Sequence, residues 1–289
     1  MPDIAIIAGT GALPRLVLEA LAGDAFVCGV EGFDVALEGV PCAGGAVETF
    51  RVERLVPFLD SLVDRGVTRV VFAGAMQRPT LDPALFDRAT AGLVPRLLGA
   101  MQAGDDATLR AVIAIFEEWD LEVMGAHEIA PDLVPEAGVL CGTVSPVDAA
   151  DVKRAAQIVQ ALGAADVGQG AVVAGGLCLA TESLPGTDAM LAFSAVHSGM
   201  KQGAKGVFFK APKPDQDHRI DLPAIGPQTV VNAAEAGLAG IAWQAGGVML
   251  LDREGVVKAA QDAGLFLWAR DENADDSLAT SAAATGDAR

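Results

Sequence analysis

Positive charge is scarce in this sequence. Its 289 residues contain 20 Lys and Arg against 38 Asp and Glu, which gives a formal net charge of −18. No run of basic residues is dense enough to neutralise a nucleic-acid backbone, so we expect no binding to DNA or RNA. Because an acidic protein that acts on an anionic substrate must concentrate its few cations locally, the positions where Lys and Arg gather are informative.

Aromatic residues and cysteines are also few. Aromatics make up 5% of the residues while hydrophobic residues make up 52%, which predicts an aliphatic core of the kind found where helices pack on parallel strands. The four cysteines are far apart and form no CxxC pair, and the three histidines are not spaced with them as zinc ligands. We therefore expect reduced thiols and no zinc site.

Long apolar runs are missing as well. The longest uncharged stretch, residues 237–251, contains Gln244 and falls short of the about 18 residues that span a membrane. The first residues lack the basic start of a secretion signal. We therefore expect a cytoplasmic protein.

Short apolar strands alternate with helices along the chain. Residues 4–8, 26–31 and 69–74 have the composition of buried strands, and residues 56–65 and 147–162 have helical character. This alternation is typical of an α/β protein whose parallel sheet is covered on both faces.

The periodic pattern is interrupted by prolines and a glycine between residues 131 and 142. We place a linker there, between an N-terminal domain of residues 1–130 and a C-terminal catalytic domain of residues 143–270. Residues 271–289 are acidic and rich in Ala, Ser and Thr, which predicts a disordered tail.

A glycine turn follows the first predicted strand and opens a helix. Its residues are Gly9, Thr10, Gly11, Ala12, Leu13 and Pro14. Backbone N–H groups and a helix dipole can hold a phosphate in this setting. Pro14 replaces the third glycine of the dinucleotide fingerprint, and the alternative interpretation is a tight strand-to-helix turn without a ligand.

Two further segments follow predicted strands. Arg78 comes after a parallel strand, on the side where open α/β sheets bind ligands, and is either an anion contact or an ordinary surface arginine. Thr187 and Asp188 follow a pair of apolar strands, beside Glu182. They either reach a substrate or metal, or one of them caps the next helix.

The segment from Lys210 to Thr229 carries the most concentrated functional groups. Its prolines exclude a regular helix or a central strand, so we predict a loop directly after an apolar strand. Asp217, Arg219 and Asp221 alternate, and an extended backbone would put all three side chains on one face. Two carboxylates there can share a hard divalent cation, Mg²⁺ or Mn²⁺, and the cations of the loop can hold a diphosphate.

A nucleophile for covalent catalysis is not apparent. The sequence has no GxSxG, no Walker phosphate loop and no cysteine in an activating setting. This pattern favours metal-assisted attack by water.

Taken in order, these motifs resemble the LpxI-type UDP-2,3-diacylglucosamine pyrophosphatases. The resemblance covers about residues 3 to 270. It is carried by residues 6–14, by Gly104-Asp105-Asp106, by Asp166-Val167-Gly168-Gln169, by residues 186–191 and by the loop with Lys210, Lys213, Gln216, Asp217, Arg219, Asp221, Leu222, Pro223, Gly226 and Thr229. Ala224 stands where the family more often has a hydroxyl residue.

The resemblance implies a Rossmann-like N-terminal domain, a distinct C-terminal α/β domain and a homodimer. It implies hydrolysis of UDP-2,3-diacylglucosamine to UMP and 2,3-diacylglucosamine 1-phosphate (lipid X) with a divalent cation. We expect Asp217 and Asp221 to be catalytic and to hold the metal. We expect substrate contacts from Gly9, Thr10, Gly11, Leu13, Arg78, Thr187, Asp188, Lys210, Lys213, Gln216, Arg219 and Thr229.

A diacyl substrate resides in a bilayer, so we also expect peripheral contact with the inner face of the cytoplasmic membrane, through an apolar groove near the domain junction. Two other functions remain open at this point. One is a nicotinamide-dependent oxidoreductase that uses the glycine turn and Glu31, although Pro14 argues against it. The other is a noncatalytic protein that binds a nucleotide or an acyl lipid.

Overall fold

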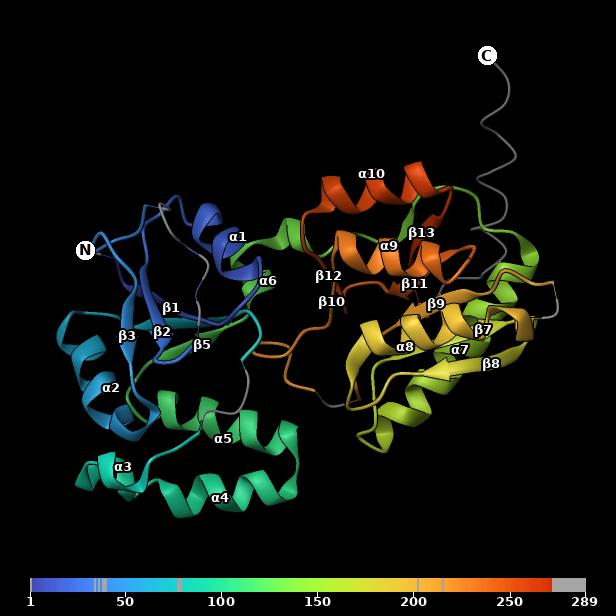
Figure 1. The fold of residues 1–289 in the computed structure, drawn as a ribbon. Helices are drawn as coiled ribbons and strands as arrows, with labels where there is room; N and C mark the ends of the chain where they lie inside the picture. The colour runs from blue at the N-terminus through green and yellow to red at the C-terminus, as the bar shows by residue number, and fades with distance from the viewer. Residues whose placement is uncertain are drawn as a thin grey trace. The chain divides into compact units, whose positions relative to one another are not determined.

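The computed structural model describes most of the chain, namely residues 2–33, 35, 37, 41–76, 80–201, 203–214 and 216–271, without the side chains of Ala103 and Asp105. The chain divides into two compact units (Figure 1). The first comprises residues 1–131 together with residues 217–221, and the second comprises residues 132–216 and 222–289. Five residues of the predicted C-terminal domain therefore belong to the first unit.

Five parallel strands form the sheet of the first unit, in the order β3-β2-β1-β4-β5. They are β1 (Ile4–Ala8), β2 (Phe26–Val30), β3 (Glu48–Phe50), β4 (Arg69–Ala73) and β5 (Glu122–Met124). Every residue of β1 and β2 is buried, because a parallel sheet covered on both faces leaves these strands no side for polar residues. The predicted Rossmann-like sheet is confirmed.

Helices cover both faces of this sheet (Figure 1). The helical segments are α1 (Leu13–Ala20), η1 (Val52–Arg54), α2 (Leu55–Asp64), η2 (Pro83–Leu85), α3 (Arg88–Ala91), α4 (Val94–Ala103), α5 (Asp105–Glu117) and α6 (Ala126–Ile129). α2 and α5 pack through Leu59 and Ile115 against Ala5 and Ile7 of β1. α1 contacts α6 on the opposite face.

The second unit has a six-stranded mixed sheet, in the order β6-β13-β11-β9-β7-β8. β9, β11 and β13 run parallel, whereas β6, β7 and β8 run antiparallel to their neighbours. The strands are β6 (Gly138–Cys141), β7 (Gly170–Ala174), β8 (Leu177–Thr181), β9 (Val207–Lys210), β11 (Gly240–Gln244) and β13 (Phe266–Arg270), and a separate parallel pair consists of β10 (Ala224–Ile225) and β12 (Met249–Leu250).

Helices also cover both faces of this second sheet. They are α7 (Pro146–Ala164), α8 (Gly186–Val196), α9 (Pro227–Glu235) and α10 (Arg253–Ala263), with 3-10 turns η3 (Pro131–Leu133) and η4 (Ser198–Lys201). Phe208 and Phe209 are neighbours on β9 and point to opposite faces. Phe209 packs with α7 through Val152, while Phe208 and Trp243 pack with α8, α9 and α10. The expectation of a distinct C-terminal α/β domain is confirmed.

The borders of the units differ in detail from the sequence-based ones. Residues 138–141, inside the expected linker, form β6 and pair antiparallel with β13. This pairing makes that stretch part of the second sheet. The expected tail, apart from Asp271, lies outside the described residues. No helix among the described residues is both long enough and apolar enough to cross a membrane.

Candidate functional site

The glycine turn after β1 is tied to the segment that follows β4. Gly9 N donates to Ala73 O at 2.8 Å, Thr10 N donates to Ala75 O at 2.9 Å, and Ala75 N donates back to Thr10 O at 3.0 Å. A Cβ atom on Gly9 would lie 2.5 Å from Ala75 O, so only glycine allows this approach. Gly74 has a φ of +95°, and its Cβ would lie 2.5 Å from Thr10 O.

These contacts give the turn a structural explanation. The amides of Gly9 and Thr10 donate within the fold, and Pro14 at the start of α1 has no amide hydrogen to offer a phosphate. Leu13 is buried. The turn therefore presents fewer donors than a dinucleotide-binding turn does. Gly9 has a packing role instead, because it lets the segment after β4 approach closely. Arg78 lies outside the described residues.

Residues 217–221 form a tight turn on the first unit. Asp217 O accepts hydrogen bonds from Ile220 N and Asp221 N, both at 3.3 Å. The Asp217 side chain accepts from Arg219 N at 3.0 Å, as Asp commonly does in such turns. The expectation of an extended backbone with three side chains on one face is therefore wrong. The reason is that this local side-chain hydrogen bond competes with an extended conformation.

Arg219 joins this turn to α5. Its Nε lies 2.9 Å from Asp217 Oδ1, its Nη2 lies 2.7 Å from Asp217 Oδ2, and its Nη1 lies 2.8 Å from Glu117 Oε1. The Arg219 guanidinium holds the pKa of the Asp217 carboxyl below its ordinary value, and the positive charge of Arg110 adds to this effect. The hydrogen bonds that Arg219 donates raise its pKa, with the larger effect from Asp217 and a smaller one from Glu117. Ile220 packs against the apolar core of the unit.

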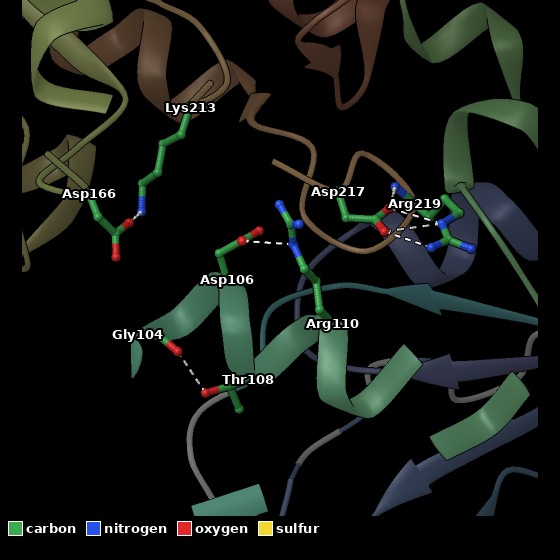
Figure 2. A network of polar contacts seen from close by, with 8 residues as sticks. All are labelled: Gly104, Asp106, Thr108, Arg110, Asp166, Lys213, Asp217 and Arg219. Carbon is green, nitrogen blue, oxygen red and sulfur yellow. Dashed lines mark hydrogen bonds and ion pairs between the residues drawn. The ribbon is translucent and has the colours of Figure 1, made fainter. Parts of the chain in front are cut away.

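The beginning of α5 adds a second group of charges (Figure 2). The helix starts at Asp105, directly after Gly104 at the N-cap position. Asp106 pairs with Arg110 at 2.8 Å, and the Thr108 hydroxyl donates to Gly104 O at 2.8 Å. The Gly-Asp-Asp motif thus opens a helix whose first turns carry Arg110, the cation that acts on Asp217.

We expect Asp217→Asn to loosen the turn. Asparagine keeps the side-chain acceptor for Arg219 N but removes the charge, and the partly exposed ion pair with Arg219 is worth about 1 kcal/mol after solvent screening. At neutral pH the amides of Ile220 and Asp221 should exchange roughly fivefold faster, as measured by hydrogen exchange. Because the folded pKa of Asp217 is lowered, this stabilisation is present above the ordinary value of about 3.9 and is lost as the pH falls through the folded pKa.

The matched control is Asp262→Asn, which breaks a well-exposed ion pair with Lys258 on α10. It should leave exchange in residues 217–221 unchanged. Equal exchange rates in Asp217→Asn and the unmodified protein would show that the charge of Asp217 does not hold the turn.

In the second unit, Lys210 ends β9 and is buried. Its Nζ donates to Thr187 Oγ1 at 2.9 Å and to Ala224 O at 3.3 Å, and Thr187 Oγ1 donates to Glu182 Oε2 at 2.9 Å. Lys210 pairs with Gly170 at the start of β7, and Glu182 follows β8, so all of these groups lie at one edge of the sheet. A Cβ on Gly170 would lie 2.7 Å from Glu182 Oε2.

This arrangement tests the capping interpretation of residues 187 and 188. The N-cap residue of α8 is Pro185, so neither Thr187 nor Asp188 caps the helix. Thr187 links Lys210 to Glu182, and Asp188 accepts a hydrogen bond from Asn232 at 2.8 Å. The capping interpretation is therefore wrong.

The start of the loop after β9 is held by a further set of contacts. Gln216 Oε1 accepts from Gln169 Nε2 at 2.8 Å and from Lys213 N at 2.9 Å. Lys213 Nζ lies 2.5 Å from Asp166 Oδ1 (Figure 2). The more distant Thr229 accepts from Gly226 N at 3.4 Å, at the start of α9.

The predicted site residues thus fall into three described groups: the glycine turn, the turn of Asp217 and Arg219 with α5, and the edge with Lys210 and Thr187 together with Lys213 and Gln216. Sequence reasoning missed Glu117, the partner of Arg219. It singled out Asp166 as part of the motif at residues 166–169 but did not pair it with Lys213. Both acidic residues are far from the loop in sequence. Glu182 follows a predicted strand, but the sequence does not show that its carboxylate accepts a hydrogen bond from Thr187.

A divalent cation fits this donor set only in part. Asp217 and Asp221 supply two carboxylates, and oxygen is the ligand that Mg²⁺ and Mn²⁺ prefer. Over the part of the chain that the structure describes, no three His, Cys, Asp or Glu side chains gather as a metal site. Mg²⁺ is commonly held by one or two carboxylates plus substrate phosphates. Asp217 and Asp221 alone are fewer side chains than such a group of three contains.

Comparisons with known proteins cover both units. The model of the LpxI N-terminal domain matches residues 3–133, and the model of the LpxI C-terminal domain matches residues 136–268. The chain is 40% identical over 277 residues to a curated protein of Caulobacter vibrioides named UDP-2,3-diacylglucosamine pyrophosphatase LpxI. The match covers 92% of this chain and 97% of that protein. The resemblance seen in the sequence motifs is confirmed.

Proposed function

The chain belongs to the LpxI family, and from this membership we propose that it hydrolyses the diphosphate of UDP-2,3-diacylglucosamine. The products are UMP and 2,3-diacylglucosamine 1-phosphate, lipid X. The observation that carries the proposal is the 40% identity to a relative with this printed activity, over 92% of the chain. The concentration of cations beside carboxylates in an otherwise acidic protein agrees with an anionic substrate.

We assign the binding of the diphosphate to Lys210, Lys213 and Arg219. Lys210 is prepared for this role because Thr187 and Ala224 O hold its ammonium in place. Arg219 has a planar guanidinium suited to phosphate oxygens, and Asp217 orients it. In this proposal Glu182 acts through Thr187, as a positioning residue for Lys210.

Asp221 is the residue to which we assign the attacking water. A carboxylate that accepts a proton from water strengthens the attack of the water oxygen on phosphorus. A new bond forms between the water oxygen and the attacked phosphorus while the bond from that phosphorus to the bridging oxygen breaks. The bridging oxygen leaves with the other phosphorus. Asp221 is half-buried and lies in a turn anchored by Arg219 and Ile220, which fixes its backbone.

The cofactor of the proposed reaction is Mg²⁺ or Mn²⁺. Asp217 and Asp221 are the residues that would hold it together with the diphosphate. The ion would neutralise charge on the phosphoryl oxygens as water attacks.

The test is the release of UMP and lipid X from UDP-2,3-diacylglucosamine by the purified full-length protein. Equal molar amounts of both products are expected, with no requirement for a nicotinamide cofactor. A protein that binds the substrate without turnover would instead be the noncatalytic lipid-binding protein. The oxidoreductase alternative loses support because Glu31 is paired with Arg51, and the amides of Gly9 and Thr10 donate within the fold.

We also propose peripheral contact with the inner face of the cytoplasmic membrane and a homodimer as the active form. The membrane contact is motivated by the diacyl substrate. Carbonate washing of membranes should release the protein, and retention like that of an integral protein would contradict the proposal.

The proposed homodimer is tested by light scattering of the purified protein, which gives its oligomeric state.

A further inference from the structure

The first unit contains an apolar cavity between its sheet and two helices. The cavity has a volume of about 240 Å³. Its walls come from β1, β2, β3 and β4 on one side and mainly from α4 and α5 on the other, with single residues of η1, α2 and α3 and residues between 76 and 86 completing the lining. All of its lining residues lie between positions 7 and 116.

The lining offers a ligand almost no hydrogen-bonding side chain. Its polar side chains are those of Thr90 and Thr108. The Thr90 hydroxyl donates to Asp87 Oδ2 at 2.6 Å and accepts from Val56 N at 3.0 Å. The Thr108 hydroxyl donates to Gly104 O at 2.8 Å. Both hydroxyls are engaged with the protein, so the cavity suits a ligand without polar groups.

Aromatic rings form part of the cavity wall. Phe72 and Phe116 pack edge to face with ring centroids 5.0 Å apart, and Phe50 stacks on Phe58, which lies outside the lining, at 3.9 Å. The cavity is larger than the roughly 150 Å³ of an engineered apolar cavity that stays dry and binds benzene. It therefore has room for several methylene groups.

The cavity opens to solvent through apolar side chains. Met76 is 40% exposed, Leu81 is 40% exposed, and Leu98 on α4 is 52% exposed. Exposed apolar side chains around an apolar cavity are typical of an entrance for a lipid and are a cost to solubility without one. None of the residues that line the cavity is charged, although the protein has a formal net charge of −18.

We propose that this cavity binds one fatty acyl chain of the substrate. The inference rests on the proposed function, in which the substrate carries two acyl chains. Burial of methylene groups here adds affinity with chain length. The cavity thereby selects acylated substrates over UDP-sugars without long chains, whose polar groups would find no partners in it.

Two variants test the proposal from different directions. Leu98→Glu puts a charge at the entrance, at a half-exposed helix position where folding should tolerate it. Val112→Phe fills the cavity from α5. The matched control is Val63→Glu, which adds the same charge at an exposed position on α2 outside the cavity. Each variant is measured for melting temperature, for the affinity of a dansyl-labelled fatty acid, and for kcat/KM with diacyl and diacetyl forms of the UDP-sugar.

Leu98→Glu and Val112→Phe should lower kcat/KM for the diacyl substrate by on the order of a hundredfold, the equivalent of losing a few buried methylenes. Their kcat/KM for the diacetyl substrate should match that of the unmodified protein. Both should also bind the fatty-acid probe more weakly, and Val63→Glu should change none of these values.

The outcomes separate this inference from the proposed function. Normal diacyl kcat/KM and probe affinity in both folded cavity variants would overturn the acyl site while hydrolysis stands. If the unmodified protein hydrolyses neither UDP-sugar but binds the probe, and the cavity variants lose that binding, the lipid site stands and the proposed function fails. Absence of both hydrolysis and probe binding in the unmodified protein would reject both.

Discussion

Replacing Asp221 with alanine is expected to reduce turnover of UDP-2,3-diacylglucosamine roughly a thousandfold, which is about 4 kcal/mol of activation free energy. The carboxylate would act on the attacking water or its cation, and either role contributes mainly in the transition state. The backbone around it is already fixed, because Asp221 N donates to Asp217 O and Arg219 ties the same turn to Glu117. Substrate affinity should therefore change little, since Lys210, Lys213 and Arg219 remain.

The control for Asp221→Ala is His218→Ala, which changes an exposed side chain in the same turn. It should keep normal turnover. Turnover, substrate affinity and melting temperature are to be measured on one preparation of each variant. Near-normal turnover in Asp221→Ala, or a loss of activity in step with a lower melting temperature, would refute the catalytic assignment.

Removal of divalent cations is the second change with a large expected effect. In a chelator, turnover should fall by more than about a thousandfold, because a bound cation stabilises transition-state charge by several kcal/mol. Addition of Mg²⁺ or Mn²⁺ in excess of the chelator should restore it. Hard, oxygen-preferring ions are expected because the nearby donors are the carboxylates of Asp217 and Asp221.

A second readout distinguishes an ion that arrives with substrate from a structural one. The described residues form no group of three metal-ligating side chains, so chelation should leave the melting temperature of the substrate-free protein unchanged. Full turnover in the chelator would contradict metal-assisted hydrolysis. A large drop in melting temperature would instead indicate a resident ion.

The layers of both units could be predicted from local sequence, whereas the backbone geometry of residues 217–221 could not. β1 and β4 correspond closely to their predicted apolar runs because buried parallel strands have a clear composition. Alternation within residues 217–221 suggested an extended strand, but strand geometry depends on a pairing partner that a sequence does not reveal. In its place, the Asp217 side chain accepts a hydrogen bond from Arg219 N and closes a turn.

The partners of the predicted site residues depended on tertiary contacts. Glu117 lies 102 positions from Arg219, and Asp166 lies 47 positions from Lys213. Neither pairing leaves a periodic signal in one sequence. The glycine turn shows a different difficulty. Its pattern suggests phosphate binding, but Gly9 also has a packing role, because its Cβ would lie 2.5 Å from Ala75 O.

The membership of residues 217–221 in the first unit affects how the protein can be divided experimentally. A fragment that ends at residue 131 would lack Ile220, which covers part of its apolar core, and would lose Arg219 as a partner of Glu117. A fragment that begins at residue 132 would carry the same five residues without the helix that binds them. Gene fusions, split reporters or domain exchanges cut at this border would therefore separate a catalytic candidate, Asp221, from the surface that shapes its turn.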